Sequence, residues 1–437
     1  MLIEFSVGNA LSFKDRVTLS MVAGRDTTLP ENVIRNAEGT NLSLLKTAAI
    51  YGANASGKSN LVASLMFMRS FVQNSSKEGQ KDSPIDVVPF KLYASMPSKP
   101  TTLEIIFLHE GIRYIYGFSA DSKRIYREWL FSNEKKKMRR LFERIHESRS
   151  STPLFKYSSY WKGEKKRLEK ITRPNALFIS VAAQFNNKQA EIVFGWFAKK
   201  LRAISDFPTY TSEHYFTCDL ARNKPTTKAK IIKFLEQADP GIKDFNIKKV
   251  SFLESKEFIQ MPEEMKKQFV RNLPKGAKPY TNEITTIHAA IDSKAKKIDV
   301  LFGFEEESEG TQKLFSISGP WSHVLEKGYT LVVDELDVRL HPLLTRWLIQ
   351  TFHNQQMNPK GAQLIFTTHD SSLLEKSLFR RDQIWFTEKS AEGASNLYSL
   401  WDFKEGRPRK EENLQKGYLA GRYGAIPILE NWEHGRS

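Results

Sequence analysis

The residues with the clearest chemistry form an eight-residue segment that follows the pattern G-x-x-x-x-G-K-[ST] and occupies positions 52–59. The apolar stretch Thr47–Tyr51 precedes it, and a helix-compatible stretch follows it. Glycines let backbone N–H groups turn toward phosphate oxygens, Lys58 can reach the β- and γ-phosphates, and Ser59 can hold Mg²⁺. The segment therefore predicts a loop that binds a nucleoside triphosphate. Its expected contact residues are Gly52, Asn54, Ser56, Gly57, Lys58, Ser59 and Asn60.

Two carboxylates follow a second apolar stretch, Thr330–Val333, far downstream of this loop. We expect the stretch to form a buried strand beside the strand of the phosphate loop. Asp334 would then lie near Mg²⁺, and Glu335 could polarise the water that attacks the γ-phosphate. The sequence thus predicts Ser59 and Asp334 as metal ligands and Glu335 as the catalytic base.

A histidine follows a third apolar stretch, which covers residues 363–368. In parallel sheets, ligand-binding groups collect at the carboxyl ends of the strands. His369 is therefore predicted to contact the γ-phosphate and to complete a catalytic set with Lys58 and Glu335.

Residues 308–313, Ser-Glu-Gly-Thr-Gln-Lys, form a further candidate for phosphate binding. The hydroxyl groups and the Gly310 amide at the start of a helix suit an anion. The same residue types also occur in ordinary loops and helix caps. From the residues alone, both interpretations of Ser308 and Gly310 stay open.

The order of these parts along the chain resembles ATPases of the ABC type, in particular the soluble SMC and RecF-like branch. In that branch two nucleotide-binding heads face each other head to tail. The resemblance implies that Ser308 and Gly310 act across a dimer interface on the nucleotide held at Lys58 of the partner subunit. It also implies that Asp337 relays between the two nucleotide sites.

The chain also looks like the bacterial AAA-15/AAA-21 ATP-binding proteins, through segments 3–9, 12–14, 175–180, 340–342 and 418–427. This resemblance runs nearly end to end. Many such proteins belong to abortive-infection, RloA-like and PARIS-like anti-phage systems. It implies ATP and Mg²⁺ as cofactors, a homodimer or higher homo-oligomer, and a separate effector protein such as a Toprim-type nuclease. The chain departs from the transporter signature Ser-Gly-Gly-Gln at 308–311, and Gln73 is a glutamine-loop candidate by position only.

Composition favours a protein of the reducing cytoplasm. Cys218 is the one cysteine among 437 residues, so the chain can form neither an internal disulfide nor a cysteine-based zinc site. Its apolar runs are shorter than the roughly 18 residues of a membrane span. We therefore expect no membrane partner.

Positive charge is concentrated in the middle of the chain. Residues 131–290 hold 32 Lys and Arg against 17 Asp and Glu, a net charge of +15 out of +16 for the whole chain. A basic surface favours contact with polyphosphates, and exposed aromatic side chains can stack on bases. Nucleic acid is therefore a possible partner, and a solvated basic face or an acidic protein partner is the alternative. The aromatic residues interleaved with the basic runs are Phe155, Tyr157, Tyr160 and Trp161.

The motifs and the alternating apolar runs predict an α/β fold, an ABC-type P-loop ATPase head with mixed sheets. We expect residues 1–130 to form its N-terminal lobe and residues 291–437 its C-terminal lobe. Residues 131–290 are predicted to form a basic, mainly helical insertion, with helices over 189–204 and 227–237.

Three other functions are consistent with parts of the sequence. An SMC/RecF-like ATPase of DNA repair or recombination would use the same motifs directly on DNA. A binding module that does not hydrolyse ATP would leave Glu335 idle. A nuclease could use the acidic residues 334–337, but only 68 residues follow His369, fewer than the ~100 of a typical domain.

Overall fold

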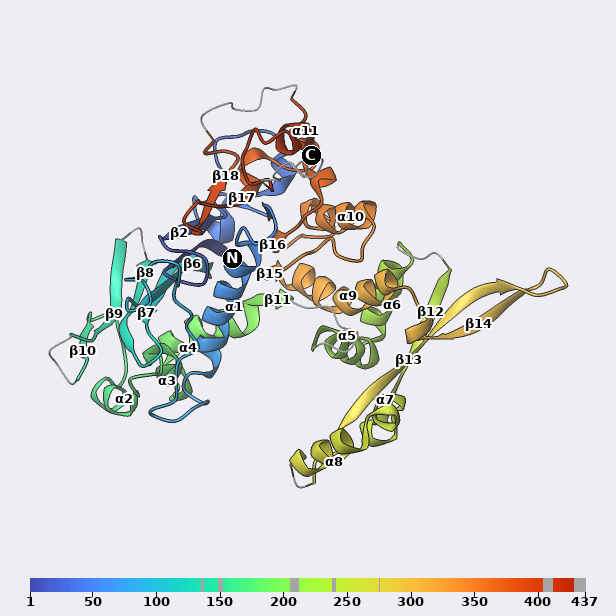
Figure 1. Ribbon diagram of the computed structural model, residues 1–437, viewed down its shortest axis with the longest axis horizontal. Helices are drawn as coiled ribbons and strands as arrows, with labels where there is room; N and C mark the ends of the chain where they lie inside the picture. The colour runs from blue at the N-terminus through green and yellow to red at the C-terminus, as the bar shows by residue number, and fades with distance from the viewer. Residues whose placement is uncertain are drawn as a thin grey trace, which may run out of the picture. The chain divides into compact units, whose positions relative to one another are not determined.

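The computed structural model describes residues 1–134, 137–147, 152–204, 212–237, 241–274, 276–403 and 412–427. The chain divides into two compact units. Figure 1 shows the chain as a ribbon whose colour runs with residue number from blue at the N-terminus to red at the C-terminus. The first unit comprises Met1–Ser205, Val324–Val338 and Thr345–Ser437, and the second comprises Asp206–His323 and Arg339–Leu344.

A seven-stranded antiparallel sheet forms one layer of the first unit, in the order β10-β9-β8-β7-β6-β1-β2. Along β6 and β7, buried and partly exposed side chains largely alternate, as expected when one sheet face meets the core. The strands are β1 Leu2–Gly8, β2 Val17–Ser20, β6 Thr101–His109, β7 Ile112–Ala120, β8 Ile125–Glu134, β9 Lys137–Ile145 and β10 Leu154–Tyr157.

The second sheet of this unit has six strands in the order β11-β15-β16-β5-β17-β18. All neighbours pair in parallel except the edge strand β18, which is antiparallel to β17. Every residue of β5, β15 and β16 is buried, which explains their nearly continuous apolar sequences. The strands are β5 Thr47–Tyr51, β11 Leu201–Ile204, β15 Thr330–Val333, β16 Gln363–Thr367, β17 Ile384–Lys389 and β18 Ser395–Ser399, and β3 Val33–Ile34 pairs separately with β4 Leu44–Leu45.

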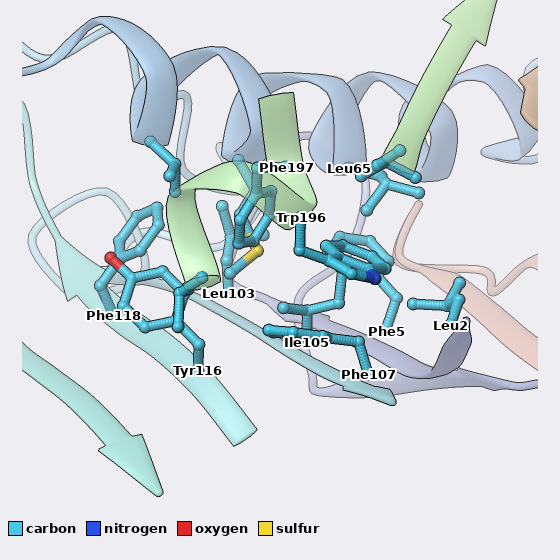
Figure 2. Packing of buried hydrophobic residues seen from close by; sticks show 14 of the residues in the cluster. Leu2, Phe5, Leu65, Leu103, Ile105, Phe107, Tyr116, Phe118, Trp196 and Phe197 are labelled. Carbon is cyan, nitrogen blue, oxygen red and sulfur yellow. The ribbon is translucent and has the colours of Figure 1, made fainter. Parts of the chain in front are cut away.

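The core of the first unit joins side chains from both sheets and from helix α1 (Lys58–Asn74). Figure 2 shows part of it, where Trp196 and Phe197 of the π-helical turn η3 (Trp196–Lys200) meet strands β1, β6 and β7. The rings of Phe107 and Trp196 stack with centroids 4.4 Å apart. The other helices of this unit are α2 Lys166–Ile171, α3 Phe178–Gln184, α4 Lys188–Gly195, most of α10 (Pro342–His353) and α11 Leu414–Leu419, with short 3-10 turns η1 Pro30–Asn32, η2 Ala37–Gly39, η6 Ser371–Leu373 and η7 Arg381–Gln383.

The second unit contains a three-stranded antiparallel sheet in the order β12-β13-β14, together with helices. Its strands are β12 Ile242–Ser251, β13 Tyr280–Ile291 and β14 Lys297–Gly303. Its helices are α5 Ser212–Asn223, α6 Pro225–Leu235, α7 Lys256–Gln260, α8 Glu263–Asn272 and most of α9 (Glu309–Lys327), with short turns η4 Phe252–Glu254 and η5 Phe304–Glu306.

The predicted α/β fold with mixed sheets is confirmed, but the inserted unit differs from the prediction. Strand β8 runs through the expected boundary at 130 and β13 through that at 290, because each is one strand of a continuous antiparallel pairing. The predicted helix over 189–204 ends early, since β11 pairs in parallel with β15. The insertion is therefore a mixed α/β unit instead of a mainly helical one.

The basic excess also lies elsewhere than expected. Residues 131–205 hold 18 Lys and Arg against 6 Asp and Glu, a net charge of +12, and they belong to the first unit. Residues 206–290 hold 14 against 11, a net charge of +3. Lys135 and Lys136, part of one predicted basic run, lie outside the described residues.

Candidate functional site

The phosphate loop connects β5 to α1, as its sequence predicts. Gly52 and Gly57 have positive φ angles of 155° and 115°, and α1 begins at Lys58. A Cβ atom on Gly52 would lie 2.5 Å from the Oγ of Ser56, and one on Gly57 would lie 2.4 Å from the Oγ of Ser395. Both positions therefore require glycine, and the backbone N–H groups at the start of α1 are available to an anion.

Lys58 is buried, and its ammonium group lies over the loop that it closes. Its Nζ donates hydrogen bonds to the carbonyl oxygens of Gly52, at 2.7 Å, and Ala53, at 3.1 Å. Burial lowers the pKa of Lys58, and the nearby carboxylates of Glu335, Asp334 and Asp337 oppose this shift. The structure thus brings the lysine and the three predicted acidic residues into one electrostatic neighbourhood.

Strand order explains how these residues meet. The strands β5, β16 and β15 are parallel, so residues 52–59, 368–370 and 334–337 follow their carboxyl ends at the same edge of the sheet. The expectation that β15 lies directly beside β5 is wrong, because the histidine strand β16 lies between them. In Figure 1 the orange β15 and β16 lie close to the blue N-terminal segment.

Thr367, the last residue of β16, links this strand to both carboxylates. Its Oγ1 donates to Oδ1 of Asp334 at 2.5 Å and accepts from the N–H of Glu335 at 2.7 Å. Glu335 has a φ angle of 52°, a left-handed conformation that costs a non-glycine residue about 1–2 kcal/mol. The Thr367 hydroxyl therefore helps to hold the proposed base in an unfavourable backbone conformation, a role that sequence reasoning did not assign.

Asp337 and His369 are also adjacent. The N–H of His369 lies 3.2 Å from Oδ2 and 3.4 Å from Oδ1 of Asp337. This contact connects the loop after β15 with the loop after β16. It brings together His369, which is predicted to contact the γ-phosphate, and Asp337, which the resemblance assigns to communication between the two nucleotide sites.

A second set of residues supports the phosphate loop from the strands β17 and β18. Thr387 Oγ1 lies 2.7 Å from Ser56 Oγ, and Ser395 Oγ donates to the Ser56 carbonyl at 2.6 Å. Asn60 donates from Nδ2 to Ser12 Oγ at 2.8 Å. Sequence reasoning missed Thr387, Ser395 and Ser12, because isolated hydroxyl residues in strands and loops carry no distinguishing pattern.

The residues present fit a magnesium-bound triphosphate. Ser59, the second residue of α1, is exposed. The carboxylate of Asp334 is close enough to Lys58 to raise the pKa of its ammonium group. Across the described ranges, no group of three or more His, Cys, Asp or Glu side chains is arranged to hold a metal by itself. Mg²⁺ in triphosphate sites takes few protein ligands and completes its coordination with phosphate oxygens and water, so the Ser59 hydroxyl and the Asp334 carboxylate are suitable ligand types. Asn54 is exposed in the same loop.

Replacing Thr367 with valine is expected to lower the turnover number about 10–100-fold, with a smaller change in nucleotide affinity. The substitution keeps the shape but removes both hydrogen bonds that position the half-buried Asp334 and Glu335. A hydrogen bond to a charged group such as the Asp334 carboxylate contributes about 1.5–3 kcal/mol, and one between neutral groups about 0.5–1.5 kcal/mol. Steady-state ATPase kinetics with Thr345→Val as the matched control test this, because the buried hydroxyl of Thr345 has no hydrogen-bond partner. Equal kcat values in the two variants would contradict the assignment.

Ser308 and Gly310 belong to the second unit, whereas the loop, the acidic residues and His369 belong to the first. Ser308 Oγ accepts from the N–H of Thr311 at 3.1 Å and lies 2.9 Å from Thr311 Oγ1. A Cβ on Gly310 would lie 2.9 Å from the carbonyl oxygen of Arg339. Ser308 thus caps the start of α9, and its role toward a nucleotide stays a prediction.

Gln73 lies near the end of α1, roughly 22 Å along the helix axis from Lys58 at 1.5 Å per residue. Its Nε2 donates to the carbonyl of Phe197 at 2.9 Å. This contact joins α1 to η3, so Gln73 is a packing residue and not a glutamine-loop residue.

The predicted stacking surface for nucleic acid is largely absent. Trp161 is buried, and Phe155 and Tyr157 pack with Phe178 in the core, because these aromatic residues fill the space under the end of the sheet. Only Tyr160 of the four is exposed, at 44%, and the guanidinium of Arg139 lies 3.9 Å from its ring centroid. The basic residues could still contact phosphates of a nucleic acid, but three of the four aromatic side chains are not available to stack on bases.

A strand, a glycine-rich loop closed by a lysine, a helix and two carboxylates at the same sheet edge define a P-loop nucleotide-binding domain. Residues 48–160 and 232–375 match the family described as "AAA domain, putative AbiEii toxin, Type IV TA system". The matched segments make up more than half of the chain, so this protein belongs to that family.

Two solved structures are similar in fold over most of their length. One is the Smc head domain of Pyrococcus furiosus with an extended coiled coil, bound to the C-terminal domain of ScpA, with 11% identity, a TM-score of 0.41, and coverage of 91% of this chain and 96% of that chain. The other is the recombination mediator protein RecF bound to ATP, with 12% identity, a TM-score of 0.36, and coverage of 91% and 97%. No curated protein matches the chain in sequence. Within the described residues, each helix is too short or too polar to cross a bilayer.

Proposed function

We propose that this protein is an Mg²⁺-dependent ATPase with an ABC-type head. The observation that carries the proposal is the shared neighbourhood of Lys58 with Glu335, Asp334 and Asp337 at one sheet edge. Lys58 would bind the β- and γ-phosphates, Ser59 and Asp334 would hold Mg²⁺, and Glu335 would act as the base toward the attacking water. The metal supplies charge neutralisation at the phosphates, and His369 would orient the γ-phosphate.

The proposal includes a dimer that ATP closes. Ser308 caps α9 through the Thr311 N–H, and the first amides of the helix, which lack an acceptor within it, can face an anion together with the Ser308 hydroxyl. In the proposed dimer, these groups of one copy contact the triphosphate bound at Lys58 of the other copy. Hydrolysis assisted by Glu335 then releases the two heads. A nucleotide-dependent choice between two states is a general means of signalling to a bound partner.

In the cell, we propose a role as sensor or scaffold for a separate effector protein, such as a Toprim-type nuclease, in cytoplasmic anti-phage defence of the abortive-infection, RloA-like or PARIS-like kind. The family description, which names a putative toxin and a toxin–antitoxin system, supports a function linked to a second component. Copurification of an effector with the full chain tests this role.

The second candidate is an ATPase of DNA repair or recombination, and the charge of the first unit favours it. Residues 131–205 carry a net charge of +12. A protein that acts directly on DNA would hydrolyse ATP faster when linear DNA is added, in the absence of any effector. A protein that serves an effector would show little stimulation by DNA alone.

Changing Ser308 to arginine is expected to abolish ATP-dependent dimerisation and to reduce turnover at least tenfold. The bulky cation would occupy the space that the proposed interface gives to phosphate. Light scattering and ATPase assays of the full chain, with Ser98→Arg in an exposed loop as the control, measure both effects. Intact association and turnover in Ser308→Arg would overturn the cross-dimer role while leaving the role of Lys58 untouched.

A further inference from the structure

A pocket of about 600 Å³ opens at the end of the seven-stranded sheet, away from the phosphate loop. The strands β6, β7 and β8 and the loop before β4 form it, and it is lined by Gly39, Thr40, Asn41, Leu42, Leu108, Gly111, Arg113 and Asn133. Its volume falls within the roughly 300–1,000 Å³ of small-molecule sites. None of these residues belongs to the nucleotide site.

This pocket lies at the opposite end of β1 from the nucleotide site. Leu2, at the start of β1, pairs with Phe107, which is next to Leu108 of the pocket. Gly8, at the other end, leads to Ser12, which contacts Asn60 beside the phosphate loop. Six residue steps along a strand span about 20 Å. Binding in the pocket and binding of a triphosphate are therefore separate events.

Two polar side chains share one wall of the pocket. Arg113 of β7 pairs with Asn133 of β8 across the antiparallel ladder, so both side chains lie on the same sheet face with Cβ atoms about 5 Å apart. That face is opposite the core, which takes Tyr114 and Tyr116 from the same strand. A ligand can therefore contact both side chains at once.

Both side chains have buried polar atoms that lack a hydrogen-bond partner. These are Nε of Arg113 and Oδ1 of Asn133. The Glu38 carboxylate, next to the lining residue Gly39, accepts from the Gly111 N–H at 3.1 Å and lies 3.6 Å from the N-terminal amine, so it is engaged elsewhere. A buried donor and a buried acceptor without partners destabilise the folded protein unless a ligand satisfies them.

We propose that this pocket binds the C-terminal carboxylate of a peptide with an apolar last residue. The guanidinium of Arg113 offers two parallel N–H groups that match the two oxygens of a carboxylate. The Asn133 oxygen accepts the N–H of the last peptide unit, and the half-buried Leu42 contacts the apolar side chain. A Cβ atom on Gly39 would meet no atom within 4 Å, so this part of the lining has room for the peptide backbone.

A carboxylate fits better than a phosphate. Arg113 is the one cationic side chain in the lining, and the N-terminal ammonium nearby is already engaged by the Leu108 carbonyl, at 2.7 Å, and by Glu38, at 3.6 Å. Phosphate sites generally combine several donors with a helix N-terminus or a second cation. The unpartnered acceptor on Asn133 also requires an N–H or O–H donor from the ligand, which a peptide provides and a phosphate dianion does not.

Fluorescence anisotropy with the nucleotide-free full chain tests this proposal. The probe is fluorescein-labelled Gly-Gly-Leu with a free carboxylate, and its comparison is the same peptide with a C-terminal amide. We expect saturable binding of the acid and at least tenfold weaker binding of the amide. Arg113→Met should weaken binding of the acid at least tenfold, and Asn133→Asp should do the same because it places a like charge beside the carboxylate.

Arg140→Met is the matched control, because Arg140 lies on β9 of the same sheet, is 41% exposed and pairs with Glu143 outside the pocket. Its affinity for the acid should equal that of the unaltered protein. Equal binding of acid and amide, or unchanged binding in Arg113→Met, would overturn the proposal. Displacement of the peptide from the unaltered protein by inorganic phosphate, together with direct phosphate binding by calorimetry that is lost in Arg113→Met, would overturn the proposal and assign the pocket to phosphate. None of these outcomes depends on ATP, so failure here leaves the proposed ATPase function untouched.

Discussion

Replacing Glu335 with glutamine is expected to slow ATP hydrolysis by about 10²–10⁴-fold, the usual contribution of a general base. The amide keeps the size of the side chain and leaves the backbone N–H free to donate to Thr367, so nucleotide binding should persist. In the proposed cycle, this variant accumulates the closed dimer with ATP. Single-turnover kinetics and the mass of the complex with ATP measure the two effects.

Glu78→Gln provides the control for this variant, because Glu78 is an exposed carboxylate in the same unit, outside the site. It should hydrolyse ATP at the unaltered rate. If Glu335→Gln hydrolyses ATP as fast as Glu78→Gln, then Glu335 is not the base. If both rates are high, another group must activate the attacking water. If both are negligible, the chain is better described as a nucleotide-dependent binding module.

Replacing Lys58 with alanine is expected to remove productive triphosphate binding, with a loss of affinity of at least 100-fold. The ammonium group would form charge-assisted hydrogen bonds to phosphate oxygens, which are roughly twice as strong as neutral ones. The variant also frees the carbonyl oxygens of Gly52 and Ala53 that Lys58 now contacts. Titration with a slowly hydrolysed ATP analogue, followed by calorimetry, gives the affinity directly.

Lys81→Ala is the control for Lys58→Ala, since Lys81 is exposed and lies beyond the end of α1. Thermal unfolding without nucleotide should be similar in both variants, which separates a binding defect from a folding defect. Retained affinity in Lys58→Ala would show that the loop does not hold the triphosphate as proposed.

The parts of the fold that the sequence predicts well are those with strong local patterns. In the loop 52–59, two glycines stand at positions where the backbone has a positive φ angle, so the conformation there can be read from the local sequence. The buried strands β5, β15 and β16 are short apolar runs. Because parallel strands share one carboxyl edge, the residues that follow them could be assigned to one site from order alone.

Other features depend on long-range pairing that no local pattern encodes. Residues 201–204 follow a helix and continue its apolar spacing, yet they form β11 because β15 offers a parallel partner 126 residues after its last residue. Likewise, Thr367 and Ser395 are single hydroxyl residues, and their importance follows only from the atoms that they meet. Trp161 and Tyr160 are neighbours in sequence, but one is core and the other surface.

The route of the chain around the acidic segment has a mechanical consequence. The chain enters the first unit at Val324, forms β15 and the segment that carries Asp334, Glu335 and Asp337, and leaves again at Arg339. The segment that carries these carboxylates is therefore part of the first unit and is joined to the inserted unit at both of its ends. We therefore expect a partner that binds the inserted unit to change the rate of nucleotide hydrolysis through these two covalent connections.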